Sequence, residues 1–221
     1  MRAGIVPFCA HRLRRDRTRF SGPGTGMAEP GPPPRRSPLD GMLPWSLPEG
    51  AVRLSELRFA EQIGLRLKPP VPAYLAGVPV PLMPNRVANM GALRTLWLGP
   101  DEWLVTSPRG LAPDLIGRLR RAVAERRASV VDLSASRAVI EIAGPQARTL
   151  LQKGCGIDLH PREFGPGQCA QTVFAKLPVI IDQLAADRLG AAPIYRLFVR
   201  RSAARWLARW LIDAADEFRF L

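Results

Sequence analysis

Few residues of this chain could carry acid–base or nucleophilic chemistry. Histidine, the usual general base near neutral pH, occurs only at His11 and His160. Cys155 lies five residues before His160, a spacing that could pair a thiol nucleophile with a base. Nothing between them requires the two side chains to converge, and a surface histidine beside Pro161 is the simpler interpretation. The residues therefore predict no catalytic centre.

Metal and nucleotide sites are also poorly represented. One histidine and two scattered cysteines in the predicted folded part do not make a zinc cluster, and no acidic calcium loop is present. The glycines at 154–156 and 165–167 fall short of the GxGxxG fingerprint, and no GxxxxGK[ST] follows a predicted strand. We therefore expect this chain to bind no cofactor and no metal by itself.

The most distinctive polar group is Asp132, Ser134 and Arg137, at the end of a predicted strand. Asp and Ser side chains in such a place can bond the following backbone amides and organise the turn. Arg137 could bind a carboxylate, from this chain or from another. The interpretations are local turn stabilisation, contact with another subunit, or binding of a small anion.

Composition narrows the classes of partner. Of the formal net charge of +13, residues 1–41 contribute +5, from eight arginines and three acidic residues. The remaining +8 could favour docking on an acidic partner, or it could be a solvated basic surface. The arginine-rich stretch 113–127 lacks interleaved aromatic residues, so we expect no nucleic-acid partner. No apolar run reaches about 18 residues, so we expect no membrane span. Three cysteines without a CxxC pair fit a reducing cytosol.

Residues 1–50 are expected to form a disordered lead rich in Arg, Pro and Gly, because such a segment buries too little apolar surface to offset its chain entropy. A transit peptide or a nucleic-acid-binding arm is an alternative. An upstream start codon is a further one, with Met27 or Met42 beginning the working protein.

The remainder predicts an α+β protein of two small sheets, each covered by helices. A first subdomain, 51–128, has strands at 52–59 and 62–68, a Pro-rich irregular stretch at 69–84, a hairpin of 95–98 with 102–106, and a helix at 113–127. A second, 129–221, has strands at 129–133, 138–142, 169–175, 179–183 and 193–199. A short helix follows Gly144-Pro145 and ends at Gly154 as its C′ glycine, and Ser202 caps a last helix that runs to Phe218.

Several ordered blocks resemble the gamma subunit of heterotetrameric sarcosine oxidase. They are F-x-x-Q-x-GLR at 59–66, LWLGPDE at 96–102, DLS-x-x-R at 132–137, GP-x-A at 144–147, DLHPREF at 158–164 and WLIDA at 210–214. The resemblance covers about residues 52–218, and a set of blocks in the same order is far more specific than any one of them.

This resemblance implies a structural, non-catalytic subunit of a bacterial cytoplasmic complex with alpha, beta and delta partners. The complex would demethylate sarcosine oxidatively to glycine, pass the one-carbon unit to tetrahydrofolate and form hydrogen peroxide. It also implies that FAD, FMN, NAD, tetrahydrofolate and zinc lie in the other subunits. The gamma chain is similar to the aminomethyltransferase-like folate-binding fold, which agrees with the α+β prediction.

Asp182 is the candidate for a functional carboxylate. It follows Val179-Ile180-Ile181, about where folate-dependent aminomethyltransferases place an acidic residue after a glycine-rich turn. Here the turn is Lys176-Leu177-Pro178, a departure that counts against a proton-handling role. The alternative that this residue would support is a stand-alone folate-binding, aminomethyltransferase-like protein.

Overall fold

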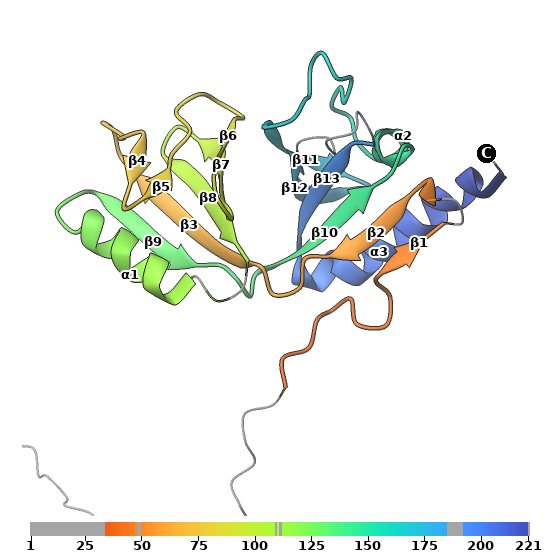
Figure 1. Cartoon of the computed structure of the whole chain (residues 1–221), viewed down its shortest axis with the longest axis horizontal. Helices are drawn as coiled ribbons and strands as arrows, with labels where there is room; N and C mark the ends of the chain where they lie inside the picture. The colour runs from red at the N-terminus through yellow and green to blue at the C-terminus, as the bar shows by residue number, and fades with distance from the viewer. Residues whose placement is uncertain (1–33, 48–49, 109, 111, 185–191, 221) are drawn as a thin grey trace, which may run out of the picture. The chain divides into compact units, whose positions relative to one another are not determined.

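The computed structural model describes residues 34–47, 50–108, 110, 112–184 and 192–220 of the chain (Figure 1). Residues 36–221 form one compact unit, within which lie all the helices and strands named below. Most of the predicted lead, with its possible start at Met27, lies outside the described residues.

Two antiparallel sheets make up the described fold. The six-stranded sheet has the order β1 (Trp45–Ser46), β2 (Arg53–Glu56), β10 (Arg137–Ala143), β13 (Ile194–Arg200), β12 (Leu177–Gln183) and β11 (Cys169–Phe174). The five-stranded sheet has the order β6 (Val87–Met90), β7 (Leu93–Gly99), β8 (Glu102–Ser107), β3 (Glu61–Leu67) and β9 (Ala128–Asp132). A small ribbon joins β4 (Tyr74–Leu75) to β5 (Val78–Pro79).

Each sheet buries one face against helices. The stripe of α1 (Ala112–Ala122) that carries Leu115 and Leu119 packs on alternate residues of β3 and β8. The stripe of α3 (Arg201–Ala215) that carries Leu207 and Leu211 packs on β10, β12 and β13, together with the short helix α2 (Ala147–Gln152). A 3₁₀ turn, η2 (Asp216–Phe220), continues α3 to the end of the described chain. The α+β prediction of two sheets covered by helices is therefore confirmed.

The other faces of the two sheets pack on one another. We call these contacts the inter-sheet cluster; its buried members are Ala60, Leu96, Leu104, Val139, Cys169, Ile180 and Phe198. Successive residues of a strand point to opposite faces, so Val139 faces the other sheet while its neighbours Ala138 and Ile140 face the helices. By the same alternation Arg137 and Arg200, which are paired with each other, lie on the same inter-sheet face as Val139 and Phe198.

The sheets do not follow the predicted ranges 51–128 and 129–221. Strand β2 belongs to the six-stranded sheet, although it lies in the first range, and β9 belongs to the five-stranded sheet. The chain crosses between the sheets at residues 57–60 and again at 133–136, so each sheet takes strands from both halves. Local patterns give the strands but not their partners, which are selected by contacts distant in sequence.

The disordered lead predicted for residues 1–50 is too long, because the compact unit begins at Arg36. Leu39 and Leu47 are buried against the α3 side of the six-stranded sheet, and the Ser37 hydroxyl donates to Glu56 Oε1 at 2.5 Å. Arg201 donates to the carbonyl oxygen of Arg36 at 3.0 Å. The few apolar residues of this stretch are sufficient because a surface made by the rest of the chain receives them.

Some of the predicted turns, helix ends and strands are confirmed and others are wrong. The GPD turn at 99–101 joins β7 to β8 as predicted, with Gly99 opposite Glu102. The predicted cap at Ser202 is wrong, because α3 begins at Arg201 and its N-cap Arg200 makes no side-chain cap bond. Helix α1 ends at Ala122, before the predicted Arg127, and the strands β1, β4, β5 and β6 were not predicted. Gly154 follows the C-cap of α2 as expected but lacks the positive φ typical of a C′ glycine.

Gly144 is the position where only glycine fits. Its φ is +127°, which residues with a Cβ rarely adopt, and an added Cβ would lie 2.4 Å from the carbonyl oxygen of Ala51. The same carbonyl accepts a hydrogen bond from Gln146, so the segment before β2 cannot move away cheaply. This close approach joins the start of α2 to the edge of the six-stranded sheet.

We therefore expect Gly144→Ala to lower the free energy of unfolding by about 3 kcal/mol, through backbone strain and the clash with Ala51 together. Urea denaturation followed by circular dichroism measures the loss. Gly156→Ala is the matched control, because no atom lies within 4 Å of its added Cβ and its φ is ordinary. Equal stability of the two variants would show that the approach at residue 144 is not tight.

Candidate subunit-contact site and the polar contacts between the sheets

The turn between β9 and β10 is organised by two of the predicted side chains. Asp132 Oδ1 accepts hydrogen bonds from the backbone N–H of Ser134 at 2.9 Å and from its hydroxyl at 2.6 Å. The Ser134 hydroxyl oxygen in turn accepts from the backbone N–H of Gln62 at 3.1 Å, and Ser136 N donates to the carbonyl of Leu133 at 2.9 Å. This geometry is what a side chain that shapes a turn requires.

Gln62 anchors this turn to the neighbouring strand. Its side chain is fully buried, and its Nε2 donates to the backbone carbonyl of Arg137 at 3.1 Å, while the backbone carbonyl of Gln62 accepts from Leu133 N at 2.7 Å. In the sequence, Gln62 stands out only as part of a family-like block. Its role in anchoring the turn depends on the pairing of β3 with β9, which the sequence does not reveal. The side chains of Asp132, Ser134 and Gln62 and the backbone carbonyl of Arg137 together fix where the chain leaves one sheet and enters the other.

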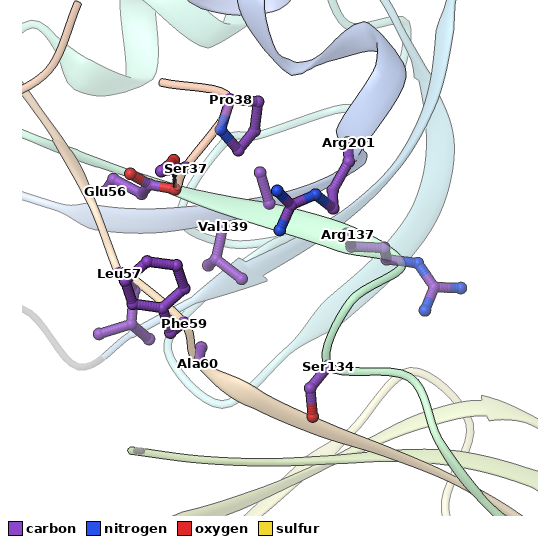
Figure 2. A pocket seen from close by; sticks show the side chains of 11 residues that line it. Ser37, Pro38, Glu56, Leu57, Phe59, Ala60, Ser134, Arg137, Val139 and Arg201 are labelled. Carbon is purple, nitrogen blue, oxygen red and sulfur yellow. Dashed lines mark hydrogen bonds between the residues drawn. The ribbon is translucent and has the colours of Figure 1, made fainter. Parts of the chain in front are cut away.

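Arg137 joins this network through its backbone alone. Its side chain extends away from the Ser37–Glu56 pair, whereas Arg201 points toward Pro38 (Figure 2). Arg137 Nη1 is buried and has no hydrogen-bond partner among the described residues. Burial lowers the pKa of the Arg137 guanidinium, and the positive charge of Arg200 adds to that effect against the opposing influence of Glu102. The structure thus places Asp132 and Ser134 in one network and leaves the Arg137 guanidinium outside it.

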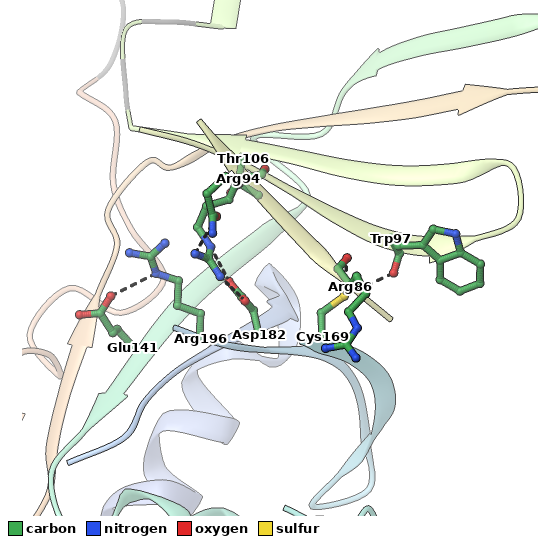
Figure 3. Close-up of polar contacts among 9 residues, drawn as sticks. Arg86, Arg94, Trp97, Thr106, Glu141, Cys169, Asp182 and Arg196 are labelled. Atoms are coloured by element: carbon green, nitrogen blue, oxygen red, sulfur yellow. Dashed lines mark hydrogen bonds and ion pairs between the residues drawn. The ribbon is translucent and has the colours of Figure 1, made fainter. Parts of the chain in front are cut away.

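Asp182 is committed to a buried ion pair between the sheets. Its carboxylate has no exposed surface and accepts two bonds from Arg94 of β7, from Nε to Oδ2 at 2.9 Å and from Nη2 to Oδ1 at 2.5 Å (Figure 3). Burial raises the pKa of Asp182, while the bonds from Arg94 and the charge of Arg196 oppose that shift. Both carboxylate oxygens are therefore engaged in joining β7 to β12.

A second ion pair lies next to the first. Arg196 Nε donates to Glu141 Oε2 at 3.1 Å, across directly opposed positions of β10 and β13. A cavity of about 310 Å³ between the sheets is lined by Arg94, Arg196 and polar residues that include Asn89 and Ser107. Both arginines beside it already have carboxylate partners.

The cysteines are not arranged for nucleophilic chemistry. Cys169 is fully buried in the inter-sheet cluster, and its thiol donates to the carbonyl of Trp97 at 3.4 Å. Burial, reinforced by the charge of Asp182, raises the pKa of this thiol to about 12. Cys155 and His160 are not joined by a hydrogen bond in the described chain. His160 is exposed, as the simpler interpretation of the sequence expected, and its Nδ1 accepts from Arg162 N at 3.3 Å.

Neither a metal-ligand cluster nor a membrane-spanning helix occurs among the described residues. Within the described ranges, no group of three or more His, Cys, Asp or Glu side chains could hold a metal ion. Of the helices in those ranges, none combines the length and apolar character that a membrane crossing needs.

Comparison with known sequences gives one consistent result. Residues 73–217 match the family described as sarcosine oxidase, gamma subunit family. The chain is 36% identical over 176 residues to the sarcosine oxidase subunit gamma of Corynebacterium sp. strain U-96, covering 77% of this chain and 82% of that one. It is 36% identical over 193 residues to the same subunit of Corynebacterium sp. strain P-1, covering 83% and 91%.

Solved structures extend this similarity to the fold. A chain of the heterotetrameric sarcosine oxidase from Corynebacterium sp. U-96, in complex with pyrrole 2-carboxylate, matches with a TM-score of 0.73 and 34% identity. The match covers 84% of this chain and 96% of that chain. The glycine cleavage system aminomethyltransferase T from Bartonella henselae matches with a TM-score of 0.57, at 15% identity over 79% of this chain and 48% of that one, which shows a shared fold alone.

The buried pair between the sheets generates a stability prediction. We expect Arg94→Leu to lower the free energy of unfolding by about 3–5 kcal/mol, because it leaves the Asp182 carboxylate buried and unpaired. The matched control is Arg66→Leu, which breaks an exposed Arg–Glu102 pair of the same sheet and should cost less than about 1 kcal/mol. Removing both charges, in Arg94→Leu with Asp182→Leu, should restore most of the loss. A cost for Arg94→Leu no larger than the control would contradict a structural role for the pair.

Thiol reactivity tests the environment of Cys169. At pH 9 an ordinary thiol with a pKa of 9.0 is half ionised, whereas a pKa of about 12 leaves about a thousandth of Cys169 as thiolate. In a Cys9→Ser background we expect an aromatic disulfide reagent to modify the partly exposed Cys155 and to spare Cys169 until the protein is denatured. The measurement is the number of aromatic thiols that the reagent releases per chain at pH 9, with and without denaturant. Two reactive thiols in the folded protein would contradict the burial.

Proposed function

Because the chain belongs to the sarcosine oxidase gamma subunit family, we propose that it is the structural gamma subunit of a heterotetrameric sarcosine oxidase. The observation that carries this proposal is the structural match, which extends over nearly the whole of a chain taken from such an enzyme. The matched chain is also more than 30% identical, so the likeness goes beyond a shared fold.

The complex containing this chain is an oxidoreductase that demethylates sarcosine to glycine, passes the one-carbon unit to tetrahydrofolate and forms hydrogen peroxide. In this proposal FAD, FMN, NAD, tetrahydrofolate and zinc are bound by the other subunits, and the complex works in the cytoplasm. The two buried groups of greatest chemical interest here support such a division. Asp182 is bound by Arg94, and Cys169 keeps its proton far above neutral pH.

In this proposal the chain contributes a surface that the other subunits of the complex bind. The partners are the alpha, beta and delta subunits, and the turn set by Asp132 and Ser134 presents Arg137 as a contact for one of them. Support comes from the separation of the two roles within the turn: its carboxylate and hydroxyl satisfy one another, and the Arg137 guanidinium is left for something else. No described side chain has surroundings that only a catalytic role of this chain would explain.

Co-expression tests the proposal. The alpha, beta and delta subunits produced with this chain should yield a stable complex that oxidises sarcosine, and omission of the chain should reduce the activity per flavin by about tenfold or more, since partner binding stabilises folded subunits. The purified chain alone should be colourless and inactive toward sarcosine. Equal activity and equal thermal inactivation with and without this chain would overturn the proposal. Turnover of a folate-dependent substrate by the lone chain would favour the aminomethyltransferase-like alternative instead.

A further inference from the structure

Two arginines oppose one another at the end of the β10–β13 ladder. Arg137 and Arg200 are directly paired across the two strands and lie on the inter-sheet face. Like charges in this relation destabilise a sheet. In the same ladder Glu141 stands opposite Arg196, and these two form an ion pair at 3.1 Å. One cross-strand pair is thus neutralised within the chain, and the other is not.

Among the described residues, no carboxylate is bonded to Arg137 or Arg200. Neither guanidinium has an ion-pair or hydrogen-bond partner among the described residues, and Arg137 Nη1 is buried. The charge of Glu102 acts on Arg137, and more strongly than that of Arg200, but its carboxylate is bonded to Arg66 at 2.7 Å and not to Arg137. Helix α3 begins next to Arg200 with no acidic residue in its first turn, so its N-terminus adds to the positive potential.

Space for a ligand group adjoins both arginines. One cavity of about 370 Å³ is lined by Leu133, Ser136, Arg137, Arg200, Arg201 and Ser202. A second, of about 230 Å³, is also lined by Arg137 and Arg200, together with polar and apolar residues of β11, β12 and β13. None of the described residues that line these two cavities carries a carboxylate.

We propose that Arg137 and Arg200 receive the carboxylate of an Asp or Glu side chain from a partner subunit. This inference rests on the proposed function, and it names the chemistry of one contact within the complex. A guanidinium presents parallel N–H donors that match a carboxylate, and two of them can share its oxygens. The arriving charge would remove the repulsion across the β10–β13 ladder.

The surroundings favour a protein segment over a free anion. Pro178, which lines the smaller cavity, stands opposite Val173 at the outer edge of β11, and the Val173 side chain is 59% exposed. Arginine is enriched in the surfaces that proteins bury on association. A small anion would neutralise the arginines but would leave this apolar edge in water.

The proposal predicts opposite effects in the free chain and in the complex. In the isolated chain, Arg200→Gln removes like-charge repulsion, so the melting temperature should stay the same or rise by up to about 2 °C. A clear decrease would show that Arg200 has an internal partner and would overturn the proposal. Melting in sodium formate against sodium chloride should affect the wild type and Arg200→Gln alike.

In the complex, the dissociation constant for the immobilised alpha, beta and delta subunits should rise about 10- to 100-fold for Arg137→Gln with Arg200→Gln, since a buried carboxylate loses its partners. The matched control is Arg121→Gln, an exposed arginine of α1, which should stay within about twofold of the wild type. Replacing both residues by Lys keeps the charge but not the fork of donors, and should give an intermediate value.

The outcomes separate the two proposals. A wild-type chain that does not bind the other subunits contradicts the proposed function, and this contact with it. Wild-type binding with an unchanged dissociation constant for the double Gln variant overturns the contact alone. Unchanged binding, with stabilisation by formate that only the wild type shows, would identify a site for a small anion instead.

Discussion

The buried ion pair between Arg94 and Asp182 constrains how the two sheets meet. A carboxylate with no exposed surface requires a partner held in place, and here that partner comes from the other sheet. The apolar side chains of the inter-sheet cluster exclude water around the pair and so strengthen it. With this separation fixed, the turn at 133–136 and the Arg137–Arg200 pair take their positions at the edge of the same interface.

Local sequence patterns predicted the elements whose geometry depends on near neighbours. The hairpin of β7 and β8 follows from Pro100 between two apolar runs, and the apolar stripe of α3 follows from its spacing. The roles of Asp132 and Ser134 in their turn are local in the same sense. The burial of Leu39 and Leu47 could not be predicted, because the apolar surface that receives them is made by strands and a helix far along the chain.

The polar contacts across the sheets could be predicted only in part. Asp182 was recognised as unusual, but its partner lies 88 positions away in sequence, and no local pattern relates the two. Arg137 was recognised as a possible carboxylate ligand, but the opposition of Arg200 appears only when the register of β10 and β13 is known. A family-like block also contained Gln62 without indicating that it anchors a turn. Pairing across sheets depends on the whole fold, and side-chain type alone does not encode it.

The two crossings between the sheets also have a consequence for synthesis on the ribosome. Strand β2 emerges early, but its main partner β10 begins only at residue 137, about 80 positions later. All strands of the five-stranded sheet are made before β10, so that sheet can form while β2 has only the short strand β1 as a partner. The nascent chain therefore leaves β2 without its partner β10 for much of translation, and a cut at the midpoint of the gene would leave neither product with a complete six-stranded sheet.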